Sequence, residues 1–517
     1  MRRRFEFVLL SALLLVLCLV PTGCTIEPGT DETSTETGIS RGTDTAVSES
    51  ENISDNTKPG SDIKLVWYMP GNRQEPDISL VLDEVNKLLL DKINTTLDLQ
   101  VFSAADEYIQ KVTTALASKD AVDIVLSSKG RIDYHANSVA GNYKKLGIYM
   151  LKYPTLSNTL DNKYLDYFKV NGDLYGIPAI KTNSHNRGFL LRKDLVHKYG
   201  MNLDEITTLE SIEPYLEIIR VNELQDIPLA VAGMDLSFGA LDWDLICEED
   251  VPGALYPNSW RTEIVNQFLA PESVEYYKLM RRWFINGYMH KDAASMESIT
   301  ELLKSRRYFA AMQQLTPGTD AEISENTGIE WVQVDITKPI TTNKDIMDGV
   351  LSIPSGSKNP EKAFLFIEML YTDPNLKNLL DHGIENVHYT KKEENNVISL
   401  TDPLNSGYKP NYSEKFGNMF LSFVLDWEDP LKHEKIQEYN NSSIALNSLG
   451  FAFDRTNMEP QITACRNVVK AYCDVLFTGS VDVDSTIKQF ERELRAAGVD
   501  DLLFEMQYQY DTWRSLK

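Results

Sequence analysis

Cysteine is scarce in this chain, which has only 5 among its 517 residues. Two of them, Cys18 and Cys24, lie near the N-terminus. The other three form an odd set without a Cys-x-x-Cys pair: Cys247, Cys465 and Cys473. The last two lie on one predicted helix with a rise of about 12 Å between them, whereas a disulfide needs Cα atoms within about 7 Å. The sequence therefore excludes a disulfide framework and a cysteine zinc site, and predicts three buried thiols.

Positive charge is also scarce. The chain has 51 Lys+Arg against 76 Asp+Glu, a formal net charge of -25, and its only basic block is residues 2–4. Binding to a phosphate backbone needs a clustered basic surface, so this balance excludes a nucleic-acid partner. With 42% hydrophobic and 10% aromatic residues the chain has ample core material. This excludes disorder of the whole chain and suits about three domains or two large lobes.

The chain lacks a hydrophobic run long enough to cross a membrane. Residues 7–20 form an apolar run of about fourteen residues, whereas a spanning helix needs about 20. The run follows three arginines and ends at Val20-Pro21-Thr22-Gly23-Cys24, which predicts a signal peptide over residues 1–23. The last segment resembles the bacterial lipobox, whose cysteine is lipidated, although Pro21 stands where that pattern usually has Leu. Lipidation of Cys24 is implied; simple secretion and an uncleaved signal anchor are the alternatives.

Residues 25–62 contain almost no large apolar side chains and are rich in Thr, Ser, Glu, Asp and Gly. Such a segment cannot bury enough surface to offset the entropy of ordering, so we expect a flexible tether over residues 24–62. A lipid on Cys24 and this tether place the globular body at the extracellular face of the bacterial membrane.

The folded body begins with three short apolar runs separated by two helical patterns. The runs are residues 64–69, 97–101 and 122–126, and the helical patterns cover residues 78–93 and 108–116. This order predicts a parallel, doubly wound sheet, which binds ligands beyond the carboxyl ends of its strands. The candidate ligand residues at those ends are Trp67, Tyr68, Asn72, Ser127 and Ser128. The first two are neighbours on a strand, so at least one side chain must face each side of the sheet.

An Asn171-Gly172 turn between apolar flanks predicts a hairpin, and the strand and helix pattern restarts near residue 180. This predicts a second α/β lobe, and helical patterns dominate the end of the chain. Candidate ligand residues follow the entry into this lobe or lie near the ends of its strands: Asn183, His185, Trp243, Gln313 and Gln314. For His185, a hydrogen bond at the hinge is an equally open interpretation.

Late segments of the chain resemble a known family. Residues 371–374 read Tyr-Thr-Asp-Pro, residues 379–389 read Leu-Leu-Asp-His-Gly-Ile-Glu-Asn-Val-His-Tyr, and residues 450–454 read Gly-Phe-Ala-Phe-Asp. They resemble the bacterial extracellular solute-binding lipoproteins that deliver sugars to ABC importers, in the LplA-like subgroup with a C-terminal extension. Asn386 replaces the second Gly of the family's Gly-Ile-Glu-Gly turn, and Asn tolerates the left-handed backbone that such a turn needs.

The resemblance implies a two-lobed α/β fold like that of periplasmic binding proteins, in which two doubly wound sheets are joined by a hinge. It implies a first lobe over residues 63–178 plus about 345–400, a second lobe over residues 180–340, and a largely helical part over residues 400–517 that packs on both. Hinge crossings are expected near residues 178–181 and 347–354. The implied ligand is a carbohydrate, in most of the family an oligosaccharide, and the implied partner is the permease of an ABC transporter. We expect a monomer without cofactor, metal or catalytic activity.

The aromatic content suits a carbohydrate ligand. A sugar offers a flat C–H face and a rim of hydroxyls, so its site combines Trp or Tyr with polar side chains. The chain has 7 Trp and 24 Tyr. Trp243, in a loop of the second lobe, is the expected platform, whereas Trp283 and Trp513 lie on helical patterns and are expected in the core. Trp427 could line a cleft or hold the C-terminal extension.

Three other functions stay open on the sequence alone. A secreted glycoside hydrolase would also show aromatics and carboxylates, and the densest carboxylate cluster beside a Trp is Asp426, Glu428 and Asp429; no Gly-x-Ser-x-Gly, His-Glu-x-x-His or P-loop motif occurs. A metal-binding lipoprotein needs clustered ligands, and the 7 His are scattered. A peptide-binding or purely structural surface lipoprotein is the third.

Overall fold

The computed structural model describes residues 63–71, 75–128, 131–233, 242–257, 259–393, 396–402 and 406–516. The expected signal peptide, the lipidated Cys24 and the tether lie outside these residues, and so does Asn72. The described residues belong to one compact unit. Its described part contains two hydrophobic cores, each built around one sheet.

The first lobe is built on a five-stranded sheet with the order β2-β1-β3-β14-β6. Its first half is β1 (Lys64–Pro70), α1 (Ile78–Ile93), β2 (Thr96–Phe102), α2 (Ala105–Ser118) and β3 (Ile124–Ser127). Because β1 pairs in parallel with both β2 and β3, the predicted strand–helix–strand order is confirmed. In α1 the buried side chains recur at every fourth residue, which places them on one helix face: Val81, Val85 and Leu89.

Two later strands complete this sheet, β6 (Gly176–Pro178) and β14 (Val350–Ser352). β14 is antiparallel to β3 and to β6, and Val350 lies opposite both Ser127 and Pro178. The carboxyl ends of β3 and β6 therefore meet the start of β14 at one edge of the sheet. The chain leaves and re-enters the lobe at this edge.

The second lobe has a four-stranded sheet with the order β12-β7-β11-β8. Its strands are β7 (Asn186–Arg192), β8 (Ile227–Ala230), β11 (Tyr308–Leu315) and β12 (Trp331–Asp335). β8 and β11 are parallel, whereas β7 is antiparallel to β11 and to β12, so this sheet is mixed. The reason is that β7 enters the lobe from the crossing, and therefore runs opposite to β11, whose last residue Leu315 pairs with Asn186.

Three crossings join the two cores. The second crossing was expected near residues 347–354. It lies earlier in the chain, because β14 already belongs to the first sheet. The core residues that bracket the crossings are Ile177 and Phe189, Trp331 and Ile346, and Leu449 and Phe451.

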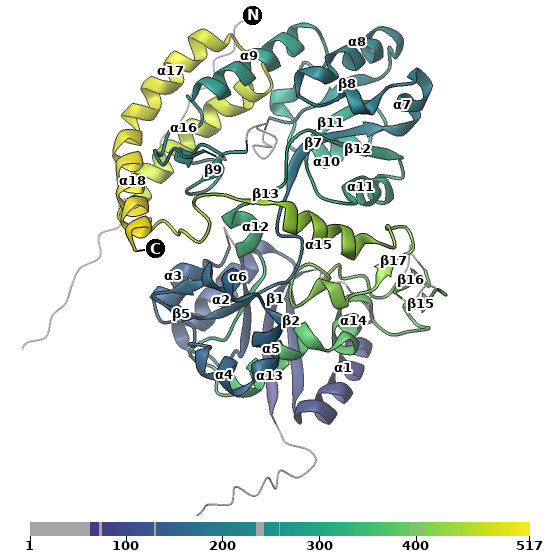
Figure 1. Cartoon of the computed structure of the whole chain (residues 1–517), viewed down its shortest axis with the longest axis vertical. Coiled ribbons are helices and arrows are strands. Elements are labelled where there is room, and N and C mark those ends of the chain that lie inside the picture. The colour runs from purple at the N-terminus through teal and green to yellow at the C-terminus, as the bar shows by residue number, and fades with distance from the viewer. Residues whose placement is uncertain are drawn as a thin grey trace, which may run out of the picture. The chain divides into compact units, whose positions relative to one another are not determined.

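The C-terminal part divides at the third crossing. Tyr408, Tyr412 and Phe416 pack into the first core. Helices α16 (Glu459–Phe477), α17 (Val483–Ala496) and α18 (Val499–Ser515) contribute to the second core, where α16 and α17 contact α9 (Pro271–Ile285). Figure 1 shows these three C-terminal helices together along one side of the second lobe.

Short elements connect these layers. The hairpin β4 (Lys169–Val170) and β5 (Asp173–Leu174) has the predicted Asn171-Gly172 turn, with φ of 51° and 84°. The others near the first core are α3 (Tyr134–Val139), α4 (Gly147–Lys152), α5 (Pro154–Thr159), α6 (Asn162–Asp166), α12 (Asn343–Met347), α13 (Pro360–Thr372), α14 (Pro374–His382), β15 (Tyr389–Lys391), β16 (Val397–Leu400) and β17 (Val424–Leu425). Helix α15 (Lys432–Ser442) lies beside the first crossing. Those of the second lobe and the crossings are α7 (Lys193–Tyr199), α8 (Glu213–Asn222), β9 (Asp244–Leu245), β10 (Ala254–Leu255), α10 (Ile299–Leu303), α11 (Thr319–Thr327), β13 (Ile340–Thr341) and β18 (Ile444–Ala445).

A buried ion pair fixes α14. Lys377 and Asp381 pair within this helix, and both side chains are fully buried. Lys377 Nζ also donates to the Ser413 carbonyl (3.1 Å), and Ser422 Oγ donates to Asp381 Oδ2 (2.8 Å). Burial lowers the pKa of Lys377, whereas the charge of Asp381 opposes this shift. The pair ties α14 to residues 413–422, and removing one partner would leave an uncompensated charge in the core.

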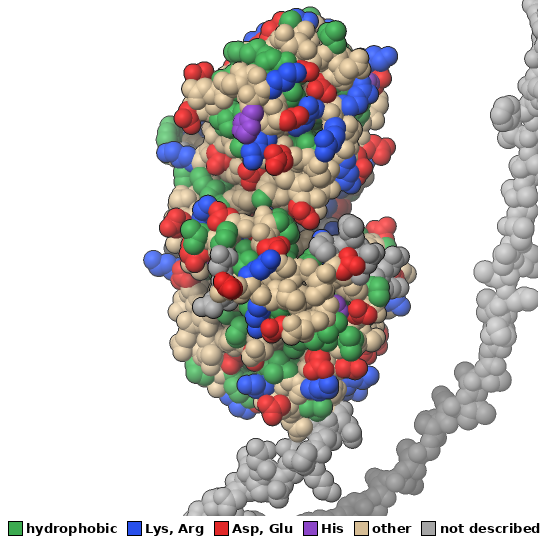
Figure 2. All heavy atoms as spheres, turned by 90° about the vertical axis from the view of Figure 1, so that its right-hand side faces the viewer, with side chains coloured by type: hydrophobic (Ala, Val, Ile, Leu, Met, Phe, Trp, Pro, Cys, Tyr) green, Lys and Arg blue, Asp and Glu red, His purple; other side chains and the backbone are tan. Residues whose placement is uncertain are grey.

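The surface carries both signs of charge. On the face shown in Figure 2, the described Lys and Arg side chains are interspersed with Asp and Glu and form no broad basic area. Within the described ranges, no helix is long and apolar enough to cross a membrane.

Candidate functional site

Other parts of the chain cover the carboxyl ends of the strands in the first sheet. Ser127 Oγ lies 3.0 Å from Tyr143 Oη. Ser128 is buried, and its hydroxyl has no hydrogen-bond partner among the residues that the structure describes. Tyr412 lies over the end of β1, where a Cβ on Gly71 would be 2.9 Å from its hydroxyl. The two serines are therefore enclosed by the protein at this edge.

Trp67 and Tyr68 lie on opposite faces of β1, as strand alternation requires. Trp67 is fully buried, and its ring makes edge contacts with Phe366 (5.6 Å between centroids) and Phe416 (4.8 Å). It is a core residue, which corrects the expectation that its ring faces a ligand. Tyr68 is half-buried and packs edge-on against Phe102 at 5.2 Å. Burial raises the pKa of Tyr68, so its hydroxyl stays neutral.

His185 is part of a hydrogen-bonded hinge. Its Nδ1 lies 2.9 Å from Asp345 Oδ1, and its Nε2 lies 3.3 Å from Gln314 Nε2. Asp345 also accepts from Thr342 N (2.8 Å) in the capping box of α12. Burial raises the pKa of Asp345, but the bonds and charge from His185 and the bonds from Thr342 outweigh it, so this pKa lies below its usual range. Because both ring nitrogens are engaged within the protein, the hinge interpretation describes His185.

The other candidates from this region also serve the framework. The Asn183 N–H donates to Asn440 Oδ1 in α15 at 3.1 Å. Gln313 is half-buried in β11, opposite Gly188 of β7. A Cβ on Gly188 would lie 2.0 Å from the Val334 carbonyl oxygen, so β7 and β12 approach too closely for any other residue. The structure thus brings Asn183, His185 and Gln314 together at the hinge.

Trp243 belongs to an aromatic group of the second lobe. It is half-buried, and its ring lies 5.1 Å from that of Tyr256. The guanidinium of Arg261 lies 4.9 Å from the Tyr256 ring centroid. The preceding residue, Asp242, pairs with Arg187 of β7 at 2.8 Å, which fixes this end of the loop to the sheet. Trp243 therefore keeps part of its ring exposed beside residues 256–261.

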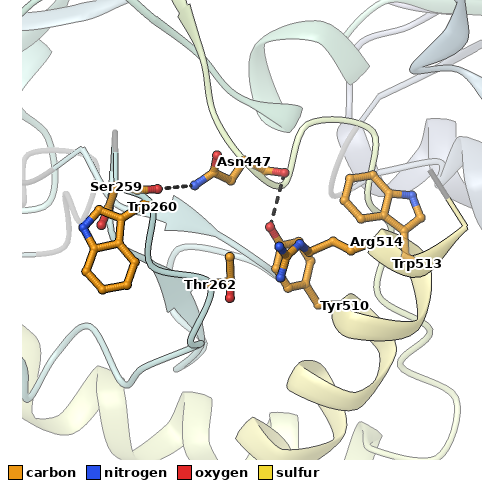
Figure 3. A pocket seen from close by; sticks show the side chains of 7 residues that line it. All are labelled: Ser259, Trp260, Thr262, Asn447, Tyr510, Trp513 and Arg514. Carbon is orange, nitrogen blue, oxygen red and sulfur yellow. Dashed lines mark hydrogen bonds between the residues drawn. The ribbon is translucent and has the colours of Figure 1, made fainter.

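An open pocket of about 360 Å³ is lined by residues that neighbour Arg261 in sequence. Figure 3 shows its walls, with Trp260 on one side and the end of α18 on the other. The volume lies within the range of small-molecule sites, roughly 300–1,000 Å³. Its lining residues are Ser259, Trp260, Thr262, Asn447, Tyr510, Trp513 and Arg514.

Trp260 gives this pocket an unusual wall, because its side chain is 90% exposed. Opposite it, Trp513 stacks on the buried Tyr510 (5.7 Å between centroids) and is only half-buried itself. The Arg514 guanidinium lies over the Tyr510 ring at 5.6 Å and 3.7 Å from the Asp511 carboxylate. The exposed indole therefore offers an apolar face beside the pocket on which a ligand could stack.

Polar groups complete the pocket. Asn447 Nδ2 donates to the Ser259 carbonyl at 2.8 Å, which joins the two walls and leaves the amide oxygen as an acceptor. Tyr510 Oη donates to the Asn447 carbonyl at 3.4 Å. Thr262 adds a hydroxyl. Indole faces beside an amide, a hydroxyl and a guanidinium can receive a sugar ring, stacking on its C–H face and bonding its hydroxyl rim.

The two Trp of the pocket were missed from the sequence. Trp283 is a core residue as expected, with 1% of its surface exposed. Trp513 was also expected in the core; it is half-buried and packs against the second core, and it lines the pocket from the last turn of α18. Trp260 has a signal that could have found it, because it lies in the polar stretch Asn-Ser-Trp-Arg-Thr after Pro257.

The described residues offer no metal centre. No group of three or more His, Cys, Asp and Glu side chains in these ranges could hold an ion. Cys247, Cys465 and Cys473 are free and buried, as predicted. Burial raises the pKa of Cys247 to about 12 and that of Cys465 to about 11, which makes both thiols unreactive.

Sequence comparison connects this architecture with known proteins. A profile described as "Bacterial extracellular solute-binding protein" matches residues 92–377, more than half of the chain. The chain belongs to the bacterial extracellular solute-binding proteins. A second profile, for a domain of unknown function, matches residues 447–515, which include the third crossing and the C-terminal helices. The pocket is lined partly by these residues.

Relatives of this solute-binding protein cover almost its whole length. A carbohydrate ABC transporter substrate-binding protein of Streptococcus pneumoniae serotype 4 is 26% identical over 474 residues, which are 89% of this chain and 94% of that protein. The N-glycan transport solute binding protein NgtS of Streptococcus pneumoniae has a TM-score of 0.79 at 24% identity, over 87% of this chain and 98% of that one. Its complex with Man5GlcNAc has a TM-score of 0.67 at 24% identity, over 88% and 99%. These structures confirm the two-lobed solute-binding fold with C-terminal helices.

Proposed function

We propose that this solute-binding protein captures an oligosaccharide outside the cell and delivers it to an ABC importer. The observation that carries the proposal is the pocket with an exposed Trp260, a half-exposed Trp513 and polar groups between them. The relative with 26% identity is a carbohydrate ABC transporter substrate-binding protein, and NgtS has been crystallised with Man5GlcNAc, which supports a sugar as the ligand class.

The mechanism follows from two lobes joined by three crossings. A sugar that stacks in the pocket gains further contacts when the other lobe approaches it. The ligand then shifts the equilibrium toward the closed form by its difference in affinity for the two forms. The closed form is the one that docks on the importer's permease and delivers the sugar to it.

The surroundings of the protein follow from its N-terminal sequence. We propose that Cys24 is lipidated and that residues 24–62 tether a monomeric body to the extracellular face of the membrane. A capture protein held this way stays within reach of its permease.

Hydrolysis of the sugar is not part of this proposal. The densest carboxylate cluster is engaged with lysines: Glu428 pairs with Lys432 at 2.6 Å, and Asp429 pairs with Lys435. Asp426 lies 3.3 Å from Lys392 Nζ. Each carboxylate has its own cation, whereas a glycosidase needs two carboxyls that face each other across the scissile bond. We therefore expect binding without turnover.

A thermal-shift screen of the mature chain tests this function. Neutral and acidic oligosaccharides, peptides and divalent ions would be offered at millimolar concentration. A ligand at about 100 times its Kd stabilises the folded state by about 2.7 kcal/mol, which raises the Tm measurably. A selective rise with one class of sugar, without release of product, supports the proposal. A rise with peptides or ions only would contradict it.

A further inference from the structure

A short helix of the first lobe exposes aliphatic side chains to solvent. Ile148 and Leu151 of α4 are 71% and 85% exposed. The other side of this helix is fixed to the lobe, because Tyr149 and the following Tyr153 stack on Phe364 of α13 at 5.6 and 6.1 Å. The two aliphatic side chains are therefore held outward by the packing of their neighbours.

α4 lies at the edge of the sheet where β1 begins. Lys152 Nζ pairs with Glu361 in the first turn of α13 at 2.6 Å, and the next residue, Lys362, donates to the Ile93 carbonyl at 2.7 Å. Ile93 ends α1 immediately before β2, whose first residues pair with the start of β1. Figure 1 shows α4 and α13 at the same end of the lobe as the start of β1, with α8 at the opposite end of the described body. The described part of the chain thus begins at the same end of the lobe as α4.

Exposed lysines also lie at this edge, each beside a carboxylate. Lys145 and Lys152 flank the helix, with side chains 63% and 58% exposed, and pair with Asp173 and Glu361. Exposed aliphatic side chains flanked by lysines can contact a lipid surface, where the aliphatic groups enter the interface and an ammonium group can exchange its carboxylate partner for a phosphate.

We propose that this edge, defined by Ile148, Leu151, Lys145 and Lys152, rests on the lipid surface of the membrane. The proposal depends on the anchoring at Cys24 under the proposed function. A tether of residues 24–62 has an end-to-end distance of roughly 35 Å. At that distance the local concentration of lipid is high, so a weak contact is enough. The second lobe and its pocket then point away from the membrane, toward the medium from which sugar arrives.

Site-directed spin labelling tests this orientation. The mature chain, residues 25–517 with an N-terminal His-tag in place of the lipid, would be attached through a nickel-chelating lipid to vesicles of phosphatidylglycerol and phosphatidylcholine. A nitroxide at Leu151→Cys should lose several-fold of its collision rate with a water-soluble chromium complex when the protein is attached. A nitroxide at Leu224→Cys is the matched control, because Leu224 is 86% exposed in the second lobe and should keep its rate. The three natural cysteines are buried and should not be labelled.

Other results would overturn the proposal. Equal aqueous exposure of both labels on attached vesicles would show that the edge does not meet lipid. Shielding of the Leu151→Cys label only after the permease is added to the vesicles would assign the edge to the importer instead. Ile148→Ser together with Lys152→Gln should restore the aqueous exposure of the label without changing the Tm. The nickel tether replaces Cys24, and sugar binding is measured on the same vesicles, so a failed contact is distinguished from failed anchoring or failed capture.

Discussion

Replacing Trp260 by Ala should weaken sugar binding without loss of stability. A sugar ring that stacks on one face of the indole covers roughly 60 Å², about a quarter to a third of a Trp side chain. At about 25 cal/mol per Å² this burial contributes about 1.5 kcal/mol, so its loss should raise the Kd about tenfold. Because Trp260 is 90% exposed in the free protein, the variant should unfold within about 0.5 kcal/mol of the wild type.

Isothermal titration with the sugar found in the thermal-shift screen measures the change in Kd, and urea unfolding measures the stability. Two matched controls separate the effects. Phe504→Ala removes another aromatic that is 74% exposed on α18 but does not line the pocket, and should change neither quantity. Trp283→Ala removes a core Trp and should lower the free energy of unfolding by about 3–5 kcal/mol.

An unchanged Kd in Trp260→Ala would refute the placement of the sugar in this pocket. It would leave open that the protein binds a sugar elsewhere. A Kd that changes equally in Phe504→Ala would refute the argument in another way, because the effect would then belong to α18 as a whole rather than to the pocket wall.

Three further changes have defined outcomes. Lys377→Met should lower the free energy of unfolding by about 3–5 kcal/mol, because the buried Asp381 carboxylate loses its partner; in urea unfolding, adding Asp381→Leu should recover part of the loss. Asp345→Asn should reduce stability at pH 7 but not in acid. Burial opposes the shift, but the bond from His185 leaves the folded pKa of Asp345 below its ordinary value, so its contribution is present above the unfolded pKa near 3.9 and is lost as the pH falls through the lower folded pKa; the Tm values of both proteins should converge as the pH falls through that lower pKa. Cys24→Ser should release the protein from the membrane fraction into the medium, as an immunoblot of both fractions would show.

The first sheet could be predicted from the sequence because its signals are local. Two amphipathic helices separate three apolar runs, and a right-handed crossover leaves parallel strands as the favoured arrangement. The direction of β7 could not be predicted in this way. It depends on where the chain crosses between lobes, and that is decided by pairing with β11, more than 100 positions later in the chain.

The candidate site was harder to predict, since its partners are far apart in sequence. Trp67 is a core residue because Phe366 and Phe416 cover it, and strand alternation alone does not show which face is covered. His185 is a hinge residue because Asp345 lies beside it, 160 positions along the chain. The pocket arises only when α18 packs beside residues 259–262, so no motif within either segment predicts it.

The hinge itself limits how the lobes can move. In α15, Asn440 donates to the Lys181 carbonyl (3.0 Å) and accepts from Asn183 N (3.1 Å) and Ser184 Oγ (3.0 Å). The neighbouring Tyr439 donates to Asn186 Oδ1 (2.5 Å) and to the carbonyl at the end of β11 (3.1 Å). These bonds hold α15 to the first crossing and to the second sheet at once. Bending within residues 181–186 would break several of them together. On the other side, Ala179 N and Ile180 N donate to the carbonyls of Gly349 (3.0 Å) and Gly417 (2.8 Å), which hold this part of the crossing to the first lobe. Closure is therefore expected to move α15 with the second lobe, with the flexing at the junction of residues 180 and 181 and at the other two crossings.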